Sequence, residues 1–125
     1  MSPPMRVLIT GSTTWTDAQA LRRELKDLPS NTVVVTGDCP GIDALAIAVA
    51  TELGFAVEAM KKNRADRKAF PEASWMGLNE RMLAAGIDLV LAFHPDYGKA
   101  GCARGTAHLV DLAVAAGVAT RTLIC

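Results

Sequence analysis

The chain has 125 residues, 50% of them hydrophobic, which is enough for one packed core, and we predict a single domain over residues 1–125 with a short tail at residues 1–4. Lysine and arginine total 13, as do aspartate and glutamate, so the chain lacks the basic excess typical of proteins that bind nucleic acid over a whole surface. Three scattered cysteines without CxxC spacing and two histidines predict no disulfide framework, no metal site and no cofactor.

The chain begins without a secretory pattern. Residues 1–4 lead directly into an apolar run, with no basic segment, long apolar stretch or small-residue cleavage site. We therefore expect a cytoplasmic protein that has no membrane partner.

Five short apolar runs predict β-strands. Most are continuous rather than alternating, as expected of parallel strands that are covered by helices on both faces. The runs lie at residues 6–10, 32–36, 56–60, 88–93 and 119–124.

Four helical patterns separate these runs. The first begins at a predicted capping box of Thr16 and Gln19. The second opens near Asp38-Cys39-Pro40, where a proline in the first turn loses no hydrogen bond, and the third and fourth cover residues 73–85 and 104–116. This alternation predicts an α/β fold: a single Rossmann-like, doubly wound parallel sheet of five strands in the order 3-2-1-4-5.

The segment from Lys61 to Lys68 carries five basic residues in eight positions and is followed by Phe70. We expect a solvated loop. Because the segment follows the carboxyl end of a strand, a lid whose cations meet ligand phosphates is the alternative.

The predicted strand order places the topological switch point between the first and fourth strands. Ligands of such sheets bind there, outside the carboxyl ends of the strands, so the loops that start at Gly11 and His94 are the candidate site. After the first strand, the N–H groups and hydroxyls of Gly11, Ser12, Thr13 and Thr14 suit a phosphate, and a tight capped turn is the alternative.

The loop after the second strand repeats this composition with Gly37, Asp38, Gly41 and Asp43. Asp38 is placed to cap the helix, and Asp43 to interact with the helix dipole. As an alternative, both carboxylates accept hydrogen bonds from a ribose or a base.

The loop after the fourth strand, residues 94–106, is the most distinctive. Its three glycines allow close approach of a ligand, and Arg104, Gly105 and Thr106 at the helix start combine a guanidinium, backbone donors and a hydroxyl that favour an anion. A flexible connection is the alternative.

Several of these motifs resemble, in order, the small YspA-like members of the SLOG superfamily. They are Gly11-Ser12, Gly37-Asp38 with residues 41–46, Asn79 with Met82, and Arg104-Gly105-Thr106. The superfamily includes the LOG phosphoribohydrolases and the DNA-processing DprA proteins. The resemblance implies a nucleotide or nucleotide-derived small molecule as ligand, with its ribose or base near Asp38, Asp43 and Asn79.

Two positions depart from the resemblance. Leu109 occupies the place of the LOG catalytic glutamate, and Leu78 stands where relatives commonly have arginine. The hydrolytic constellation therefore does not carry over intact. The candidate replacement acids and bases are Asp38, Asp43 and His108, followed by Asp96 and Asp111.

These observations favour a binding module that acts as a sensor, carrier or sequestering protein. The first alternative is a LOG-like N-ribosidic hydrolase of nucleoside phosphates, and the second is DprA-like binding of single-stranded DNA, which the neutral net charge disfavours. The broad apolar surface of the third helix, with Trp75, Met76 and Met82, predicts a homodimer or higher homo-oligomer.

Overall fold

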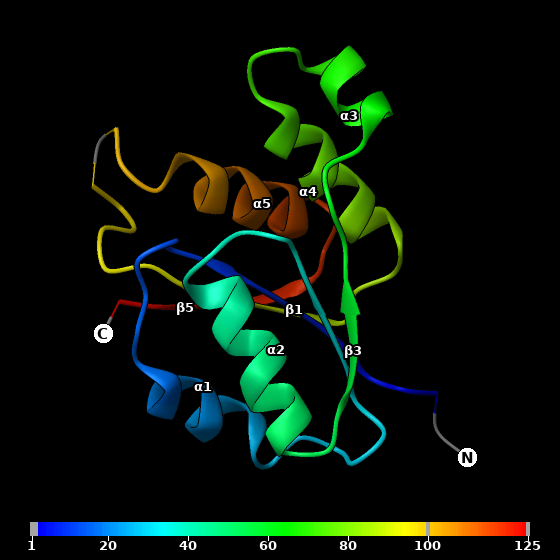
Figure 1. Cartoon of the computed structure of the whole chain (residues 1–125), viewed down its shortest axis with the longest axis vertical. Helices are drawn as coiled ribbons and strands as arrows, with labels where there is room; N and C mark the ends of the chain where they lie inside the picture. The colour runs from blue at the N-terminus through cyan, green and yellow to red at the C-terminus, as the bar shows by residue number, and fades with distance from the viewer. Residues whose placement is uncertain (1–2, 100, 125) are drawn as a thin grey trace.

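Each pair of successive strands is separated by one helix or, after the third strand, by two, in the described part of the chain, residues 3–99 and 101–124 of the computed structural model (Figure 1). The strands are β1 (Arg6–Gly11), β2 (Val33–Thr36), β3 (Ala56–Ala59), β4 (Leu89–Phe93) and β5 (Ala119–Leu123). The helices are α1 (Ala18–Leu25), α2 (Ile42–Glu52), α3 (Arg64–Ala69), α4 (Ser74–Ala84) and α5 (Arg104–Ala115). The five predicted strands are confirmed, with ends that shift by about one residue.

The strands form one parallel sheet in the order β3-β2-β1-β4-β5. This order confirms the predicted Rossmann-like, doubly wound α/β topology. Central strand β1 pairs with β2 on one side and with β4 on the other, so the switch point lies between β1 and β4. There the Ser12 N–H donates to the Phe93 carbonyl over 2.8 Å and ties the two strand ends together.

The sheet has a hydrophobic core on each face, because successive residues of a strand point to opposite sides. Val7 and Ile9 of β1 pack with α1 and α2, whereas Leu8 packs with α4 and α5 (Figure 1). The helix residues of the first core include Leu21, Leu25, Ile42, Ala46 and Val49, and those of the second are Leu78, Met82, Leu109 and Ala113. Burial on both faces accounts for the continuous apolar runs of the central strands β1, β2 and β4.

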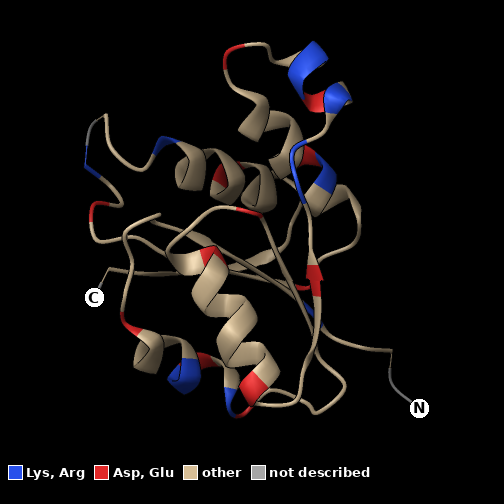
Figure 2. Ribbon diagram, viewed as in Figure 1, with Lys and Arg blue, Asp and Glu red and all other residues tan. Residues whose placement is uncertain are grey.

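The basic segment contains helix α3, so the prediction of a loop is wrong for residues 64–69. The Asn63 side chain accepts a hydrogen bond from the Asp66 N–H, and the Asp66 carboxylate accepts one from the Asn63 N–H, each over 2.9 Å. This capping box starts the helix. The Arg81 guanidinium donates to Asp66 at 2.9 and 2.7 Å and so fixes α3 to α4. Figure 2 shows the cations gathered on this projecting element.

Two predicted helix starts need correction. Asp17, not Thr16, is the N-cap of α1, because its Oδ1 accepts from the N–H groups of Gln19 and Ala20 at 3.0 and 3.2 Å. Helix α2 begins after Gly41 rather than at Asp38. Asp38 does not cap it, because its carboxylate binds the Lys62 ammonium instead.

The other composition-based expectations concern cysteines, metals, membranes and self-association. Cys39 and Cys102 are free thiols, and Cys125 lies outside the described residues. Across residues 3–99 and 101–124, no helix is long and apolar enough to cross a membrane, and no three potential ligands gather around a metal position. On α4, Met82 is buried and Trp75 and Met76 are half-buried, so the apolar surface is narrower than predicted. The homo-oligomer stays a prediction.

Candidate functional site

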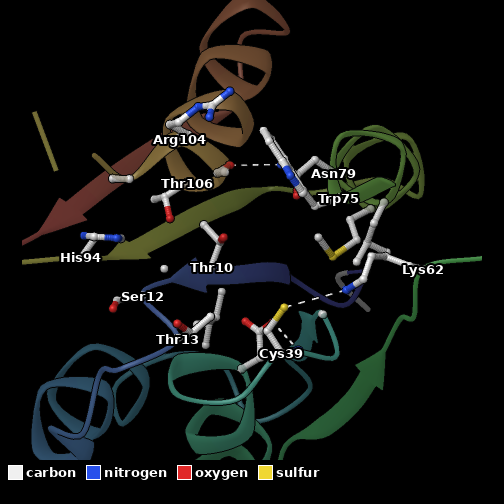
Figure 3. Close-up of a pocket in the computed structure, with 18 of the residues that line it drawn as sticks. Thr10, Ser12, Thr13, Cys39, Lys62, Trp75, Asn79, His94, Arg104 and Thr106 are labelled. Atoms are coloured by element: carbon white, nitrogen blue, oxygen red, sulfur yellow. Dashed lines mark hydrogen bonds between the residues drawn. The ribbon is translucent and has the colours of Figure 1, made fainter. Parts of the chain in front are cut away.

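A cavity of about 550 Å³ lies at the switch point of the sheet (Figure 3). Its walls come from the end of β1 and the following loop, the β2–α2 loop, the segment after β3, helix α4 and the start of α5. The lining residues are Ile9, Thr10, Gly11, Ser12, Thr13, Gly37, Cys39, Asp43, Lys62, Ser74, Trp75, Leu78, Asn79, Met82, His94, Ala103, Arg104, Gly105 and Thr106. This volume lies within the range typical of small-ligand pockets.

Most of the residues predicted from the sequence to bind a ligand line this cavity. They are Gly11, Ser12, Thr13, Gly37, Asp43, Asn79, Arg104, Gly105 and Thr106. Thr14, Asp38 and Gly41 do not line it. They contact residues that do: Thr14 contacts Ser12, Asp38 pairs with Lys62, and Gly41 lies close to Thr13. The fold therefore brings the predicted segments together, and ligand binding by them stays a prediction.

The N-terminus of α5 opens onto the cavity. Its N-cap, Ala103, makes no side-chain capping hydrogen bond, and Arg104, Gly105 and Thr106 of the first turn line the cavity. First-turn N–H groups have no intrahelical acceptor and carry partial positive charge. The Arg104 guanidinium forms none of the ion pairs found within the described residues. This end of the cavity suits an anion.

The backbone at Ala103 is strained. With φ 55° and ψ 35°, it is the one non-glycine residue with positive φ in the described ranges. This conformation costs an L-residue about 1 kcal/mol or more, and such strain concentrates at functional sites. Gly98 and Gly101 also have positive φ, but open space surrounds them. They serve the turns of the loop, so of the three glycines only Gly105 lies at the cavity.

Two glycines allow the β1–α1 loop to pack closely. A Cβ on Gly11 would lie 2.0 Å from the Phe93 carbonyl oxygen, and a Cβ on Gly41 would lie 2.2 Å from the Thr13 carbonyl group. The Ser12 hydroxyl is 2.8 Å from the Thr14 hydroxyl and accepts from the Thr14 N–H at 3.1 Å. Thr14 therefore positions Ser12, whose side chain is nearly buried in the cavity wall.

Asp43 is a buried carboxylate in the cavity wall, with 8% of its surface exposed. The Thr36 hydroxyl lies 3.0 Å from Oδ1, and the Cys39 N–H donates to Oδ2 at 3.2 Å. Burial raises the pKa of Asp43 above its ordinary value, because these two hydrogen bonds compensate only in part. Gly37 leaves room for the carboxylate, since a Cβ there would lie 2.8 Å from Oδ2.

Lys62 connects the segment after β3 to the β2–α2 loop. Its ammonium is 2.9 Å from Asp38 Oδ1 and 4.0 Å from Cys39 Sγ (Figure 3). Burial raises the pKa of Asp38, but the hydrogen bond and charge of Lys62 outweigh it and hold that pKa below its ordinary value. Burial also raises the pKa of the Cys39 thiol, which favours its neutral form.

Asn79 joins α4 to α5. Its amide nitrogen donates to the Gly105 carbonyl at 3.1 Å and lies 3.1 Å from His108 Nδ1. Because the Gly105 oxygen only accepts, the amide nitrogen faces both partners and His108 Nδ1 accepts the second proton. Trp75 packs edge-on against His108, with ring centroids 5.5 Å apart. Asn79 and His108 thus hold Trp75 and the α5 N-terminus in place around the cavity.

The candidate acids and bases differ in whether they line the cavity. Asp43 lines the cavity, whereas Asp38, Asp96, His108 and Asp111 do not. Asp96 pairs with Lys99 at 3.0 Å, and Asp111 is an exposed residue of α5. Leu109, in place of the LOG glutamate, is fully buried in the core formed with α4. No acid therefore reaches the cavity from that position.

Several cavity residues were not predicted as binding residues. Lys62 belongs to the basic segment and lines the cavity, whereas Lys61 and the three cations of α3, Arg64, Arg67 and Lys68, do not. Trp75 was predicted to belong to the apolar surface of the third helix. For three further residues, the one clue in the sequence is their position near the carboxyl end of a strand. They are Thr10, Cys39 and His94.

The fold and the cavity define a Rossmann-like α/β protein with an anion-suited site at the switch point of its sheet. A family model described as "YspA, cpYpsA-related SLOG family" matches residues 5–68, half of the chain. The chain belongs to this family, as its motifs indicated. The matched segment runs from β1 into α3 and includes the loops at Gly11 and Gly37, whereas Asn79 and Arg104 lie beyond it. No curated protein matches the chain.

Proposed function

We propose that this protein binds a nucleotide or a nucleotide-derived molecule in the switch-point cavity and acts as a sensor, carrier or sequestering module. The observation that carries the proposal is the N-terminus of α5, which lacks a side-chain cap and presents Arg104 and Thr106 to the cavity. A phosphate there receives backbone N–H donors, a hydroxyl and a guanidinium. Membership of the SLOG family is consistent with such a ligand.

The remaining walls accommodate the rest of a nucleotide. In the view of Figure 3, Thr10 lies between the α5 end and Cys39, and its hydroxyl suits a ribose. The half-buried indole of Trp75 offers an aromatic surface for a base. Groups suited to a phosphate, a ribose and a base are therefore all present in the cavity walls.

Binding screens on the purified protein test this proposal. A thermal-shift panel covers nucleoside mono-, di- and triphosphates, NAD, ADP-ribose and cyclic nucleotides, and calorimetry gives the Kd of each hit. Arg104→Met should weaken binding by about tenfold to a hundredfold, as expected for a charge-assisted hydrogen bond. Arg23→Met is the matched control, because Arg23 is exposed on α1, away from the cavity. Absence of any shift across the panel would refute the proposal.

A second candidate is N-ribosidic hydrolysis of a nucleoside phosphate, favoured by one observation. Asp43 is a buried acid in the cavity wall with a raised pKa, which suits a proton donor to a departing base. Buried Leu109 in place of the LOG glutamate favours binding instead. Mass analysis of the recovered ligand decides between them: an intact ligand supports the binding module, and a cleaved ligand whose turnover is lost in Asp43→Asn supports the hydrolase.

A further inference from the structure

The two ends of the cavity differ in charge. The α5 end offers the Arg104 guanidinium and the first-turn N–H groups. The opposite end, where Cys39 and Lys62 lie across from Arg104 and Thr106 in Figure 3, holds Asp43 together with the Asp38–Lys62 ion pair. Because Lys62 pairs with Asp38, Asp43 is the carboxylate at this second end that no cation of the described residues pairs with. A second phosphate is therefore disfavoured there.

Unused hydrogen-bonding capacity marks this end as a recognition surface. Each Asp43 oxygen has one partner, the Thr36 hydroxyl or the Cys39 N–H, and a carboxylate accepts about four hydrogen bonds. The Lys62 ammonium has three donors and one hydrogen-bonded oxygen partner, Asp38 Oδ1. Cys39 touches both groups, since its N–H donates to Asp43 and its sulfur lies 4.0 Å from Lys62 Nζ. A free acceptor and a free donor therefore lie around one residue.

We propose that Asp43 and Lys62 read the edge of a nucleobase, with Asp43 accepting from an amino or ring N–H group and Lys62 donating to the neighbouring ring nitrogen or oxo group. This specificity rests on the proposed function, because a phosphate anchored at α5 sets the direction of the ligand. The base then falls at the far end, beside Cys39, Asp43 and Lys62. An adjacent donor and acceptor are the feature that purine edges present.

The decisive probes are AMP and purine riboside 5′-monophosphate, which differ only in the exocyclic amine. Wild-type protein should bind AMP about tenfold to a hundredfold more tightly, because the amine donates to a charged acceptor. Asp43→Asn should bring this ratio close to one. Lys62→Met should weaken both compounds alike and keep the ratio, since both retain the ring nitrogen that Lys62 contacts. 2′-Deoxy-AMP should bind like AMP.

Each contrary result has a distinct meaning. Equal binding of AMP and purine riboside 5′-monophosphate to the wild type overturns the base-reading role and leaves the proposed function standing. A loss of affinity for 2′-deoxy-AMP that disappears in Asp43→Asn assigns Asp43 to the ribose and also overturns the base-reading role. Failure of every nucleotide to bind refutes the proposed function itself. The wild-type comparison needs no variant, so poor folding of a mutant does not remove the test.

Discussion

Asp43 and Asp66, the two buried aspartates of the described residues, have pKa values shifted in opposite directions, and replacing each with asparagine should change stability in opposite directions. Asp43 is 8% exposed and its pKa is raised by burial. Asp66 is 3% exposed, and hydrogen bonds from Arg81 lower its pKa. A carboxylate with a raised pKa destabilises the folded state when it ionises, whereas one with a lowered pKa stabilises it.

The hydrogen bonds around Asp43 indicate that Asp43→Asn leaves no buried group unpaired. The asparagine oxygen accepts from the Cys39 N–H, its NH₂ donates to the Thr36 oxygen, and the Thr36 hydroxyl donates to the Ile9 carbonyl, already 3.0 Å away. The variant loses a favourable helix-dipole interaction of about 0.3–1 kcal/mol but no longer buries a charge. We expect a net gain of about 0.5–1 kcal/mol at pH 7, or roughly 2–5 °C in Tm.

The pH dependence of stability shows whether each ionised carboxylate stabilises or destabilises the folded protein. Asp43 binds its proton more tightly in the folded protein, so wild type and Asp43→Asn should converge below about pH 4 and separate as the pH rises through the folded pKa. Asp66→Asn should lose about 1–2 kcal/mol at pH 7, because Arg81 and the Asn63 N–H lose a charged partner. That loss should shrink only as the pH falls below about 4.

Urea denaturation of both variants between pH 3 and pH 8 measures these differences. Destabilisation by Asp43→Asn at neutral pH would refute the account, because it would mean that the ionised carboxylate is favourable where it lies. A gain in stability together with weaker ligand binding is the trade-off expected of a functional residue.

The remaining predictions concern the backbone, the imidazole and the basic helix. Ala103→Gly should stabilise the folded protein by about 0.5 kcal/mol, since relief of the left-handed conformation exceeds the entropy cost of glycine. The control Ala107→Gly, within α5, should destabilise it by about 1 kcal/mol. Thermal unfolding that ranks the two variants in the other order contradicts the strain at Ala103. Gly41→Ala should lower the free energy of unfolding by at least about 2 kcal/mol, because the new Cβ clashes with Thr13. Gly54→Ala, which has open space around it, should lower it by about 1 kcal/mol, and equal losses would exclude the clash. Nitrogen NMR should find the proton of His108 on Nε2, and an Nδ1–H form would rule out the bond from Asn79. Nucleotide affinity in calorimetry should change by no more than about twofold when four cations are neutralised together: Lys61, Arg64, Arg67 and Lys68. None of the four lines the cavity. A larger loss would support the alternative that the basic segment covers the ligand as a lid.

The sequence predicted the central strands β1, β2 and β4 well because their burial on both faces leaves a continuous apolar run that no helix period matches. The order of strands and helices then left few topologies open. Helix α3 escaped prediction because its six residues carry almost no apolar periodicity; it is held by the Asn63–Asp66 capping box and by Arg81, which lies far along the chain. Likewise, the adjacent Thr16 and Asp17 both suit a cap, and only the structure distinguishes them.

The candidate site was predictable in part for a related reason. Gly11, Gly37 and Arg104 lie at strand and helix ends, where the topology alone sends them to the switch point. The roles of Asp38 and Lys62 depend on a pairing between loops that no local pattern encodes. The same holds for Trp75 and His108, which meet only because α4 and α5 pack on the same face of the sheet.

The central claim is that a nucleotide phosphate lies at the N-terminus of α5, and amide chemical-shift mapping with AMP tests it most directly. The largest saturable shifts should fall on Gly105 and Thr106, followed by Ser12 and Thr13 across the cavity. Their saturation should need about tenfold to a hundredfold more AMP in Arg104→Met and should be unchanged in Arg23→Met. Shifts confined to α3, or no saturable shifts at millimolar AMP and ADP-ribose, would contradict the claim.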